Sequence, residues 1–110
     1  MKLAQVVESG QEARVFRIVG AQRMVVELDA HRLRVLVQYR IKRGWMLADH
    51  GNGGVRYLNG VLRDVDGSWI VAGQNLAALE RLVNCLPTIY QHLLTPESDD
   101  WQILEKQPAG

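Results

Sequence analysis

Hydrophobic residues between positions 76 and 94 recur every three or four residues, which is the spacing of one face of an α-helix. Asn75 precedes this stripe and is a favourable N-cap, because its side chain can accept a hydrogen bond from the first turn. Pro87 falls inside the stripe without changing its phase, so the sequence predicts a helix kinked at this proline or a nearly collinear helix pair. The apolar positions of the stripe are Leu76, Leu79, Val83, Leu86, Tyr90 and Leu93.

Alternating apolar and polar residues predict β-strands in the part of the chain before this stripe. The clearest strand covers residues 33–41, where every odd-numbered position is apolar and the even-numbered positions form the opposite face. Asp66-Gly67 is typical of a hairpin turn. Extended segments are predicted over residues 13–19, 24–28, 33–41, 45–47, 55–65 and 69–71.

Two further short helices are predicted near the ends of the chain. The spacing of Leu3, Val6 and Val7 favours an opening helix, and Thr95-Pro96 predicts the start of a helix that ends near Lys106. Strands that come first and helices that come last indicate an α+β fold. We therefore expect a hairpin-connected antiparallel sheet of about five or six strands, packed on one face by the C-terminal helix or kinked helix pair. Residues 1–106 are expected to form a single domain, followed by a frayed tail at 107–110.

The composition is that of an ordinary globular protein, with 47% hydrophobic and 23% charged residues. The sequence contains no apolar run of the length that a transmembrane helix requires, and its first residues lack the pattern of a signal peptide. Cys85 is the single cysteine, so it excludes an internal disulfide. These features predict a cytoplasmic protein without a membrane partner.

Charge is distributed unevenly along the chain, although the net charge is only +1. Residues 14–63 contain ten basic and three acidic side chains, whereas residues 64–110 contain two basic and seven acidic ones. These segments carry +7 and −5, so they could pair within one molecule or between copies in a homo-oligomer.

The basic residues of the clearest strand lie on its polar face. Arg32, Arg34 and Arg40 alternate there with Gln38 between them, and Lys42 and Arg43 continue into the following turn. A guanidinium-rich face suits carboxylate or phosphate groups, and the alternative is a solvated sheet face whose charges are partly paired. Further arginines that could share this face are Arg14, Arg17 and Arg23.

A protein is the expected partner of this face, and a nucleic acid is the alternative. The nearly neutral chain, the lack of a helix-turn-helix or zinc motif and the lack of aromatic residues interleaved with the arginines disfavour the nucleic acid. Trp101 stands in a second candidate contact, since residues 101–104 could form a docking helix instead of packing on their own domain. The function expected is that of a non-catalytic accessory or inhibitory binding module.

Asp49 and His50 form the only candidate catalytic pair that we identify, beside a glycine-rich run at 51–54. They would support a hydrolase, but a polar surface turn is the favoured interpretation, because no further catalytic residue has a recognisable spacing. The three histidines and one cysteine form no zinc-binding pattern. We therefore expect no enzyme activity, no metal and no cofactor.

The turns of this chain resemble a group of small uncharacterised bacterial and phage domains. In these domains a strand ends in Leu-x-Asp-x-Gly, a hairpin follows and a helix closes the domain. The resemblance rests on residues 45–51, 58–61 and 67–71 and on the helix that follows them. His50 and the arginine-rich strand depart from the pattern. The resemblance implies the same fold and an origin in a mobile element, but it supplies no activity or site residue.

Overall fold

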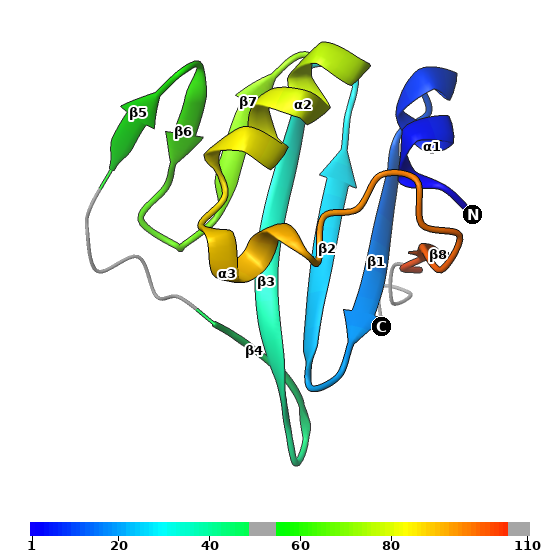
Figure 1. Ribbon diagram of the computed structural model, residues 1–110, viewed down its shortest axis with the longest axis vertical. Coiled ribbons are helices and arrows are strands. Elements are labelled where there is room, and N and C mark those ends of the chain that lie inside the picture. Colours follow the sequence, from blue (N-terminus) through cyan, green and yellow to red (C-terminus); the bar gives the residue numbers. More distant parts are fainter. Residues whose placement is uncertain (49–54, 106–110) are drawn as a thin grey trace, which may run out of the picture.

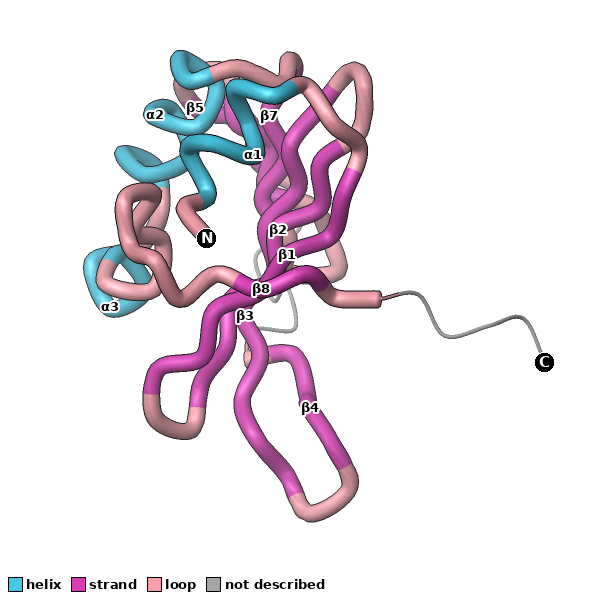
Figure 2. Tube along the Cα trace, turned by 90° about the vertical axis from the view of Figure 1, so that its right-hand side faces the viewer, coloured by secondary structure: helices cyan, strands magenta, loops and turns pink. Residues whose placement is uncertain are grey.

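The computed structural model describes residues 1–48 and 55–105, and these form one antiparallel sheet with helices packed on one of its faces (Figures 1 and 2). The helices are α1 (Leu3–Ser9), α2 (Leu76–Cys85) and α3 (Thr88–Gln91). The strands are β1 (Ala13–Val19), β2 (Gln22–Leu28), β3 (Arg32–Ile41), β4 (Gly44–Leu47), β5 (Arg56–Leu58), β6 (Val61–Arg63), β7 (Trp69–Ala72) and β8 (Gln102–Ile103). The predicted α+β class is confirmed, and the sheet has more strands than predicted, with eight in the described ranges.

β3 is the longest strand and lies near the centre of the sheet, whose order is β5-β6-β7-β3-β2-β1-β8. β2 pairs with one edge of β3. The opposite edge is divided, because β7 pairs with residues 32–35 and β4 pairs with residues 38–41. The β3–β4 hairpin therefore extends the sheet beyond the region that the helices cover (Figures 1 and 2).

The main core lies between the helices and one face of the sheet. Leu33, Val35 and Val37 of β3 are buried there, as the alternating pattern predicts. Tyr39 and Ile41 continue the same face, yet they are 36% and 42% exposed because they lie in the projecting hairpin. Other large side chains of this core are Leu3, Val15, Met24, Val26, Trp69, Val71, Leu79, Leu82, Leu86, Tyr90 and Leu93.

The stripe over residues 76–94 forms two separate helices divided at Pro87, so the structure has the helix pair of the two predicted alternatives and not the single kinked helix. Leu86 has an extended backbone with φ −65° and ψ 142°, which is the conformation that a following proline favours. Asn75 caps α2 as predicted, with its side chain accepting a 2.9 Å hydrogen bond from Ala78 N–H. Leu76 is 46% exposed, and Leu82 is buried in the core instead.

The segment after α3 does not form the predicted helix. Residues 102–103 form β8, which pairs with β1 at the edge of the sheet. Hydrogen bonds also join this segment to the first residues of the chain: Trp101 N–H donates to Met1 C=O at 3.2 Å, and Ala4 N–H donates to Pro96 C=O at 3.1 Å. The two ends of the described chain are thus bonded to each other.

The region over residues 55–65, predicted as one extended segment, is a hairpin of β5 and β6. Asn59 and Gly60 form its turn, with φ values of 52° and 79°. Both values lie in the left-handed region that the two-residue hairpin turn requires. The hairpin predicted at Asp66-Gly67 is present between β6 and β7, but its loop is longer than two residues, because Asp64 N–H donates to Ser68 C=O.

Candidate binding surface

The face of the sheet opposite the helices, here called the outer face, contains rows of side chains that cross several strands. Arg14, Glu27 and Arg34 stand directly opposite one another on β1, β2 and β3. The next row along the strands is apolar and contains Phe16, Val25 and Leu36; the row after it contains Arg23 and Gln38. The apolar row separates two charged regions of different character.

The first charged region is a continuous ion-pair network. Arg14 Nε lies 3.0 Å from Glu27 Oε2, with an angle that is not that of a hydrogen bond. Arg34 donates from Nη1 to Glu27 Oε1 and from Nη2 to Asp66 Oδ2, both at 2.5 Å. Asp66 Oδ1 also accepts hydrogen bonds from the amide and the hydroxyl of the buried Ser68. The network links three neighbouring strands to the β6–β7 loop.

These contacts change the pKa values of both members of the Arg34–Asp66 pair. Partial burial opposes ionisation of Asp66, but hydrogen bonds from Ser68 and the Arg34 guanidinium outweigh it and lower the pKa of this carboxyl to about 2. Burial also opposes the charge of Arg34, and the carboxylates of Glu27 and Asp66 overcome this effect and raise its pKa. The network therefore stabilises both charges.

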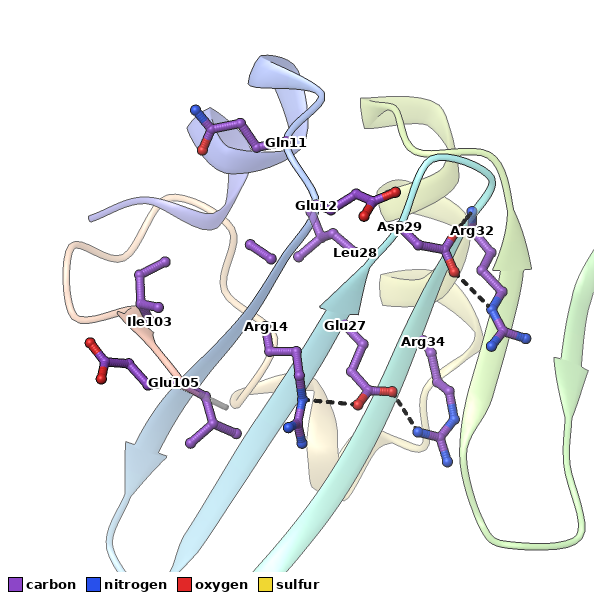
Figure 3. A pocket seen from close by; sticks show the side chains of 12 residues that line it. Gln11, Glu12, Arg14, Glu27, Leu28, Asp29, Arg32, Arg34, Ile103 and Glu105 are labelled. Carbon is purple, nitrogen blue, oxygen red and sulfur yellow. Dashed lines mark hydrogen bonds and ion pairs between the residues drawn. The ribbon is translucent and has the colours of Figure 1, made fainter. Parts of the chain in front are cut away.

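A pocket of about 830 Å³ opens beside this network, between the starts of β1 and β3 and the residues that follow β8. Figure 3 shows Arg14, Glu27 and Arg34 along one side of it and Ile103 and Glu105 on the other. Arg32 also lines the pocket, and its Nε lies 3.2 Å from Asp29 Oδ2. All three arginines of the pocket thus face a carboxylate of the same chain.

The second charged region belongs to the projecting hairpin, whose residues 39–47 are here called the arm. The Trp45 ring lies between two arginines, with its centroid 4.7 Å from Arg23 Cζ and 5.0 Å from Arg40 Cζ. Both distances are those of cation–π contacts. Arg23 also donates to Gln38 Oε1 at 2.6 Å and lies 5.7 Å from the Phe16 ring. Its pKa is lowered by burial and by the positive charge of Arg14.

The arm carries positive charge that the rest of the described chain does not neutralise. Within residues 1–48 and 55–105, no carboxylate lies within 4.0 Å of Arg23, Arg40, Lys42 or Arg43. Arg40, Lys42 and Arg43 are also exposed. The arginines at the pocket are therefore paired with carboxylates, whereas the basic side chains of the arm face none among the described residues.

The opposite side of the arm is apolar and exposed to solvent. Tyr39 pairs with Met46 across the two strands, and its hydroxyl lies 3.0 Å from Met46 Sδ. Tyr39, Ile41 and Met46 are 36%, 42% and 39% exposed, because the helices do not reach this part of the sheet. Exposed apolar side chains that lie together are typical of surfaces that bind another molecule.

The arginines named from the sequence are thus divided by the structure. Arg32, Arg34 and Arg40 occupy alternate positions of β3 and share the outer face, with Arg14 and Arg23 of neighbouring strands. Arg17 pairs with Met24 on the helix side, where it donates to His92 C=O and to Asp100 Oδ1. Lys42 and Arg43 form the turn of the arm.

Trp45 is a site residue that the sequence analysis missed. The expectation that no aromatic side chain lies among the arginines is wrong, since the Trp45 ring contacts Arg23 and Arg40. Arg40 and Trp45 are cross-strand neighbours in a hairpin whose turn is Lys42-Arg43. Pairing the two predicted strands through that turn would have placed Arg40 and Trp45 opposite each other. The contact with Arg23 comes from a third strand, so hairpin pairing alone would not have indicated it.

Trp101 is not available as a docking anchor, and this prediction is wrong. Its side chain is 1% exposed, and its Nε1 donates to Thr95 C=O at 2.9 Å. The large ring fills the core beside the C-terminal segment, where burial of an aromatic side chain stabilises the fold.

Asp49 and His50 lie outside the described residues, so the hydrolase hypothesis stays a prediction. In the described ranges, no three His, Cys, Asp or Glu side chains are grouped in a way that could hold a metal ion. None of the helices found there is long and apolar enough to cross a membrane.

Comparisons with protein-family models, curated proteins and solved structures find no match to this chain. The resemblance to small bacterial and phage domains therefore stays a prediction from turn residues.

Proposed function

We propose that this protein is a non-catalytic binding module that recognises an acidic surface of another protein through its arm and the adjoining outer face. The observation that carries the proposal is the division of the arginines. Those beside the pocket face carboxylates of their own chain, whereas those of the arm have none among the described residues. An unneutralised basic projection is suited to carboxylates supplied by a partner.

The composition of the arm favours a protein over a nucleic acid. Tryptophan, tyrosine, methionine and arginine are the residue types enriched at protein–protein interfaces, and the arm presents Tyr39, Arg40, Trp45 and Met46 within one hairpin. The exposed apolar side of the arm gives nucleic acid no phosphate contact, but it offers a protein partner area to bury. An accessory or inhibitory module, attached to a larger protein, fits this surface.

The test is capture of partners from the native host by the full chain and by two variants of equal charge change. Lys42→Glu/Arg43→Glu reverses the charge at the tip of the arm, where neither side chain forms a hydrogen bond or an ion pair with the other described residues. Arg56→Glu/Arg81→Glu reverses two exposed basic residues on β5 and α2 and is the control. We expect mass spectrometry to find a protein partner that the wild type and the control retain and the arm variant loses by about tenfold or more.

A nucleic acid would be recognised by a different outcome. Binding of DNA or RNA that falls steeply with salt, and that the arm variant abolishes, would replace the protein proposal with a nucleic-acid function. The contacts of Trp45 with Arg23 and Arg40 are the observation that would then carry it, since such a cluster can stack on bases. Equal capture by both double variants would remove the arm from either function.

A further inference from the structure

β4 leaves one of its edges without a partner strand among the residues that the structure describes. Among the described residues it pairs only with β3. β7, which pairs with the other half of the same edge of β3, has β6 on its far side, whereas no described strand lies on the far side of β4. Edge strands of this kind expose backbone groups that can bond to a further strand.

The hydrogen-bond pattern identifies which backbone groups face that edge. Ala48 N–H donates to Val37 C=O at 2.9 Å, so the even-numbered residues of β4 bond to β3. Because successive residues of a strand point their N–H and C=O groups to opposite sides, those of Trp45 and Leu47 point away from β3. Inside the described ranges, neither amide donates to another backbone group.

The two sides of the arm differ in chemistry, so they would select the side chains of an added strand. On the outer side lie Trp45, Arg40 and the nearby Lys42, and on the helix side lie Met46 and Tyr39. A strand added beside β4 would alternate its own side chains between these two sides. Acidic residues would meet the basic side, and apolar residues would bury the exposed Met46 and Tyr39.

We propose that the free edge of β4 accepts an extended segment of the partner protein in which acidic and apolar residues alternate. This inference rests on the proposed function and names how the partner is held. Main-chain hydrogen bonds to Trp45 and Leu47 supply part of the affinity, and the alternation of acidic and apolar side chains supplies the specificity. Charge complementarity with the unneutralised arm is what identifies the segment as acidic.

The first experiment uses a synthetic end-capped peptide of about seven residues, the length of an ordinary strand, in which valine and glutamate alternate. The control peptide has the same composition, with its valines and glutamates in two blocks. Amide hydrogen exchange of the isotope-labelled full chain is followed by NMR. We expect the alternating peptide to slow exchange at Trp45 and Leu47 by about tenfold or more and to leave the amides of β5, another edge strand of the sheet, unchanged.

The second experiment removes the outward donor without disturbing the β3–β4 ladder. Leu47→Pro lacks an amide proton, and proline is tolerated on an edge strand where that N–H faces away from the sheet. Leu47→Ala keeps the donor and is the matched control. Peptide affinity is expected to fall by about tenfold or more in Leu47→Pro and in Lys42→Glu/Arg43→Glu, and by less than about threefold in Leu47→Ala.

Equal binding of the two peptides, or unchanged exchange at Trp45 and Leu47 of the wild type, would overturn strand addition. The wild-type exchange measurement holds even where Leu47→Pro fails to fold. Loss of the natural partner in the arm variant, together with no effect of the alternating peptide, would leave the binding function in place and reject this way of holding the partner. If the arm variant kept the natural partner and the alternating peptide had no effect, both the binding function of the arm and strand addition would be rejected.

Discussion

Arg34 binds two carboxylates that come from different parts of the chain. Glu27 is its neighbour on β2, and Asp66 lies in the loop between β6 and β7, which the pair holds against the sheet. The Arg34 side chain is only 23% exposed, so removing its charge would leave Asp66 without its cation and Glu27 with Arg14 alone. Arg34 therefore stabilises the fold, and Arg34→Glu would report on stability before it reported on binding.

Asp66 is expected to make stability depend on pH in the acid range. The pKa of Asp66 is about 2 in the folded protein, below its ordinary value of 3.8, so folding favours the ionised carboxylate. This stabilisation is complete above pH about 4 and is lost as the pH falls from about 4 through about 2. Because the side chain is 38% exposed, we expect Asp66→Asn to lower the free energy of unfolding by only about 1 kcal/mol at neutral pH.

Urea unfolding of the wild type and Asp66→Asn at a series of pH values measures this effect. The difference between the two proteins is expected to be constant from neutral pH down to about 5 and to vanish near pH 2. In the Arg34→Met background, Asp66→Asn should cost less, because the two side chains interact. A difference that stays the same at pH 2 and at pH 7 would contradict the assignment.

At the scale of elements, β3 contributes both to the core and to the exposed surface of the sheet. Its alternation puts Leu33, Val35 and Val37 in the core and Arg32 and Arg34 on the outer face. Its length carries residues 39–41 past the helices, so the same apolar pattern becomes an exposed surface in the arm. A strand longer than the layer that covers it thus provides both a core and a contact surface.

The N-cap of α2 is expected to contribute measurably to stability. Asn75→Ala removes the hydrogen bond to Ala78 N–H and should lower the free energy of unfolding by about 1 kcal/mol. Asn75→Asp keeps an acceptor at the same place and should stay close to the wild type. Denaturant unfolding monitored by circular dichroism measures both variants. Equal stability of Asn75→Ala and the wild type would show that the cap is dispensable.

Periodicity predicted the elements whose hydrophobic pattern is long, and it failed where local and distant signals compete. The strand at residues 33–41 and the cap at Asn75 were predictable, because each depends on a few neighbouring residues. The apolar phase through Pro87 suggested continuity, but the proline forces an extended Leu86 whatever lies on either side. β8 is two residues long and exists through its pairing with β1, which no local pattern encodes.

The same limit applies to the candidate surface. Alternation alone placed Arg32, Arg34 and Arg40 on one face of β3. It could not distinguish Arg34, which is neutralised, from Arg40, which faces no carboxylate among the described residues, because Asp66 lies 32 residues after Arg34 in the chain. Which arginine is available for a partner depends on register and loop position, so it became apparent only in three dimensions.

At the scale of the whole molecule, the basic and acidic segments neutralise each other only in part. Arg34–Asp66 and Arg17–Asp100 join them within the fold. The tip of the arm remains basic. Glu97, which is 72% exposed and lies 3.7 Å from Lys2 Nζ, belongs to the segment between α3 and β8, and this segment lies away from the arm in both views (Figures 1 and 2). The molecule is therefore nearly neutral in total, but its positive arm and the acidic side chains after α3 lie apart.

This separation of charge is expected to cause weak self-association at low ionic strength. The Debye length is about 30 Å at 0.01 M salt and about 3 Å at 1 M, so attraction between the arm of one copy and the acidic segment of another is screened by salt. Light scattering should show an average mass that rises with protein concentration at low salt and equals the monomer mass at high salt. Lys42→Glu/Arg43→Glu should remove the rise. A mass independent of salt would contradict this expectation.

The hydrogen bonds of Met1 and Ala4 to residues 96–101 have a consequence for how the protein is made. During synthesis residues 1–4 leave the ribosome well before residues 96–101, to which they are hydrogen-bonded in the fold. α1 and the edge of β1 that pairs with β8 therefore reach their native environment only after this later segment has been made. The domain therefore completes its folding only after residues 96–103 have been synthesised, and a chain truncated before residue 96 would leave the backbone of Met1 and Ala4 without these hydrogen bonds.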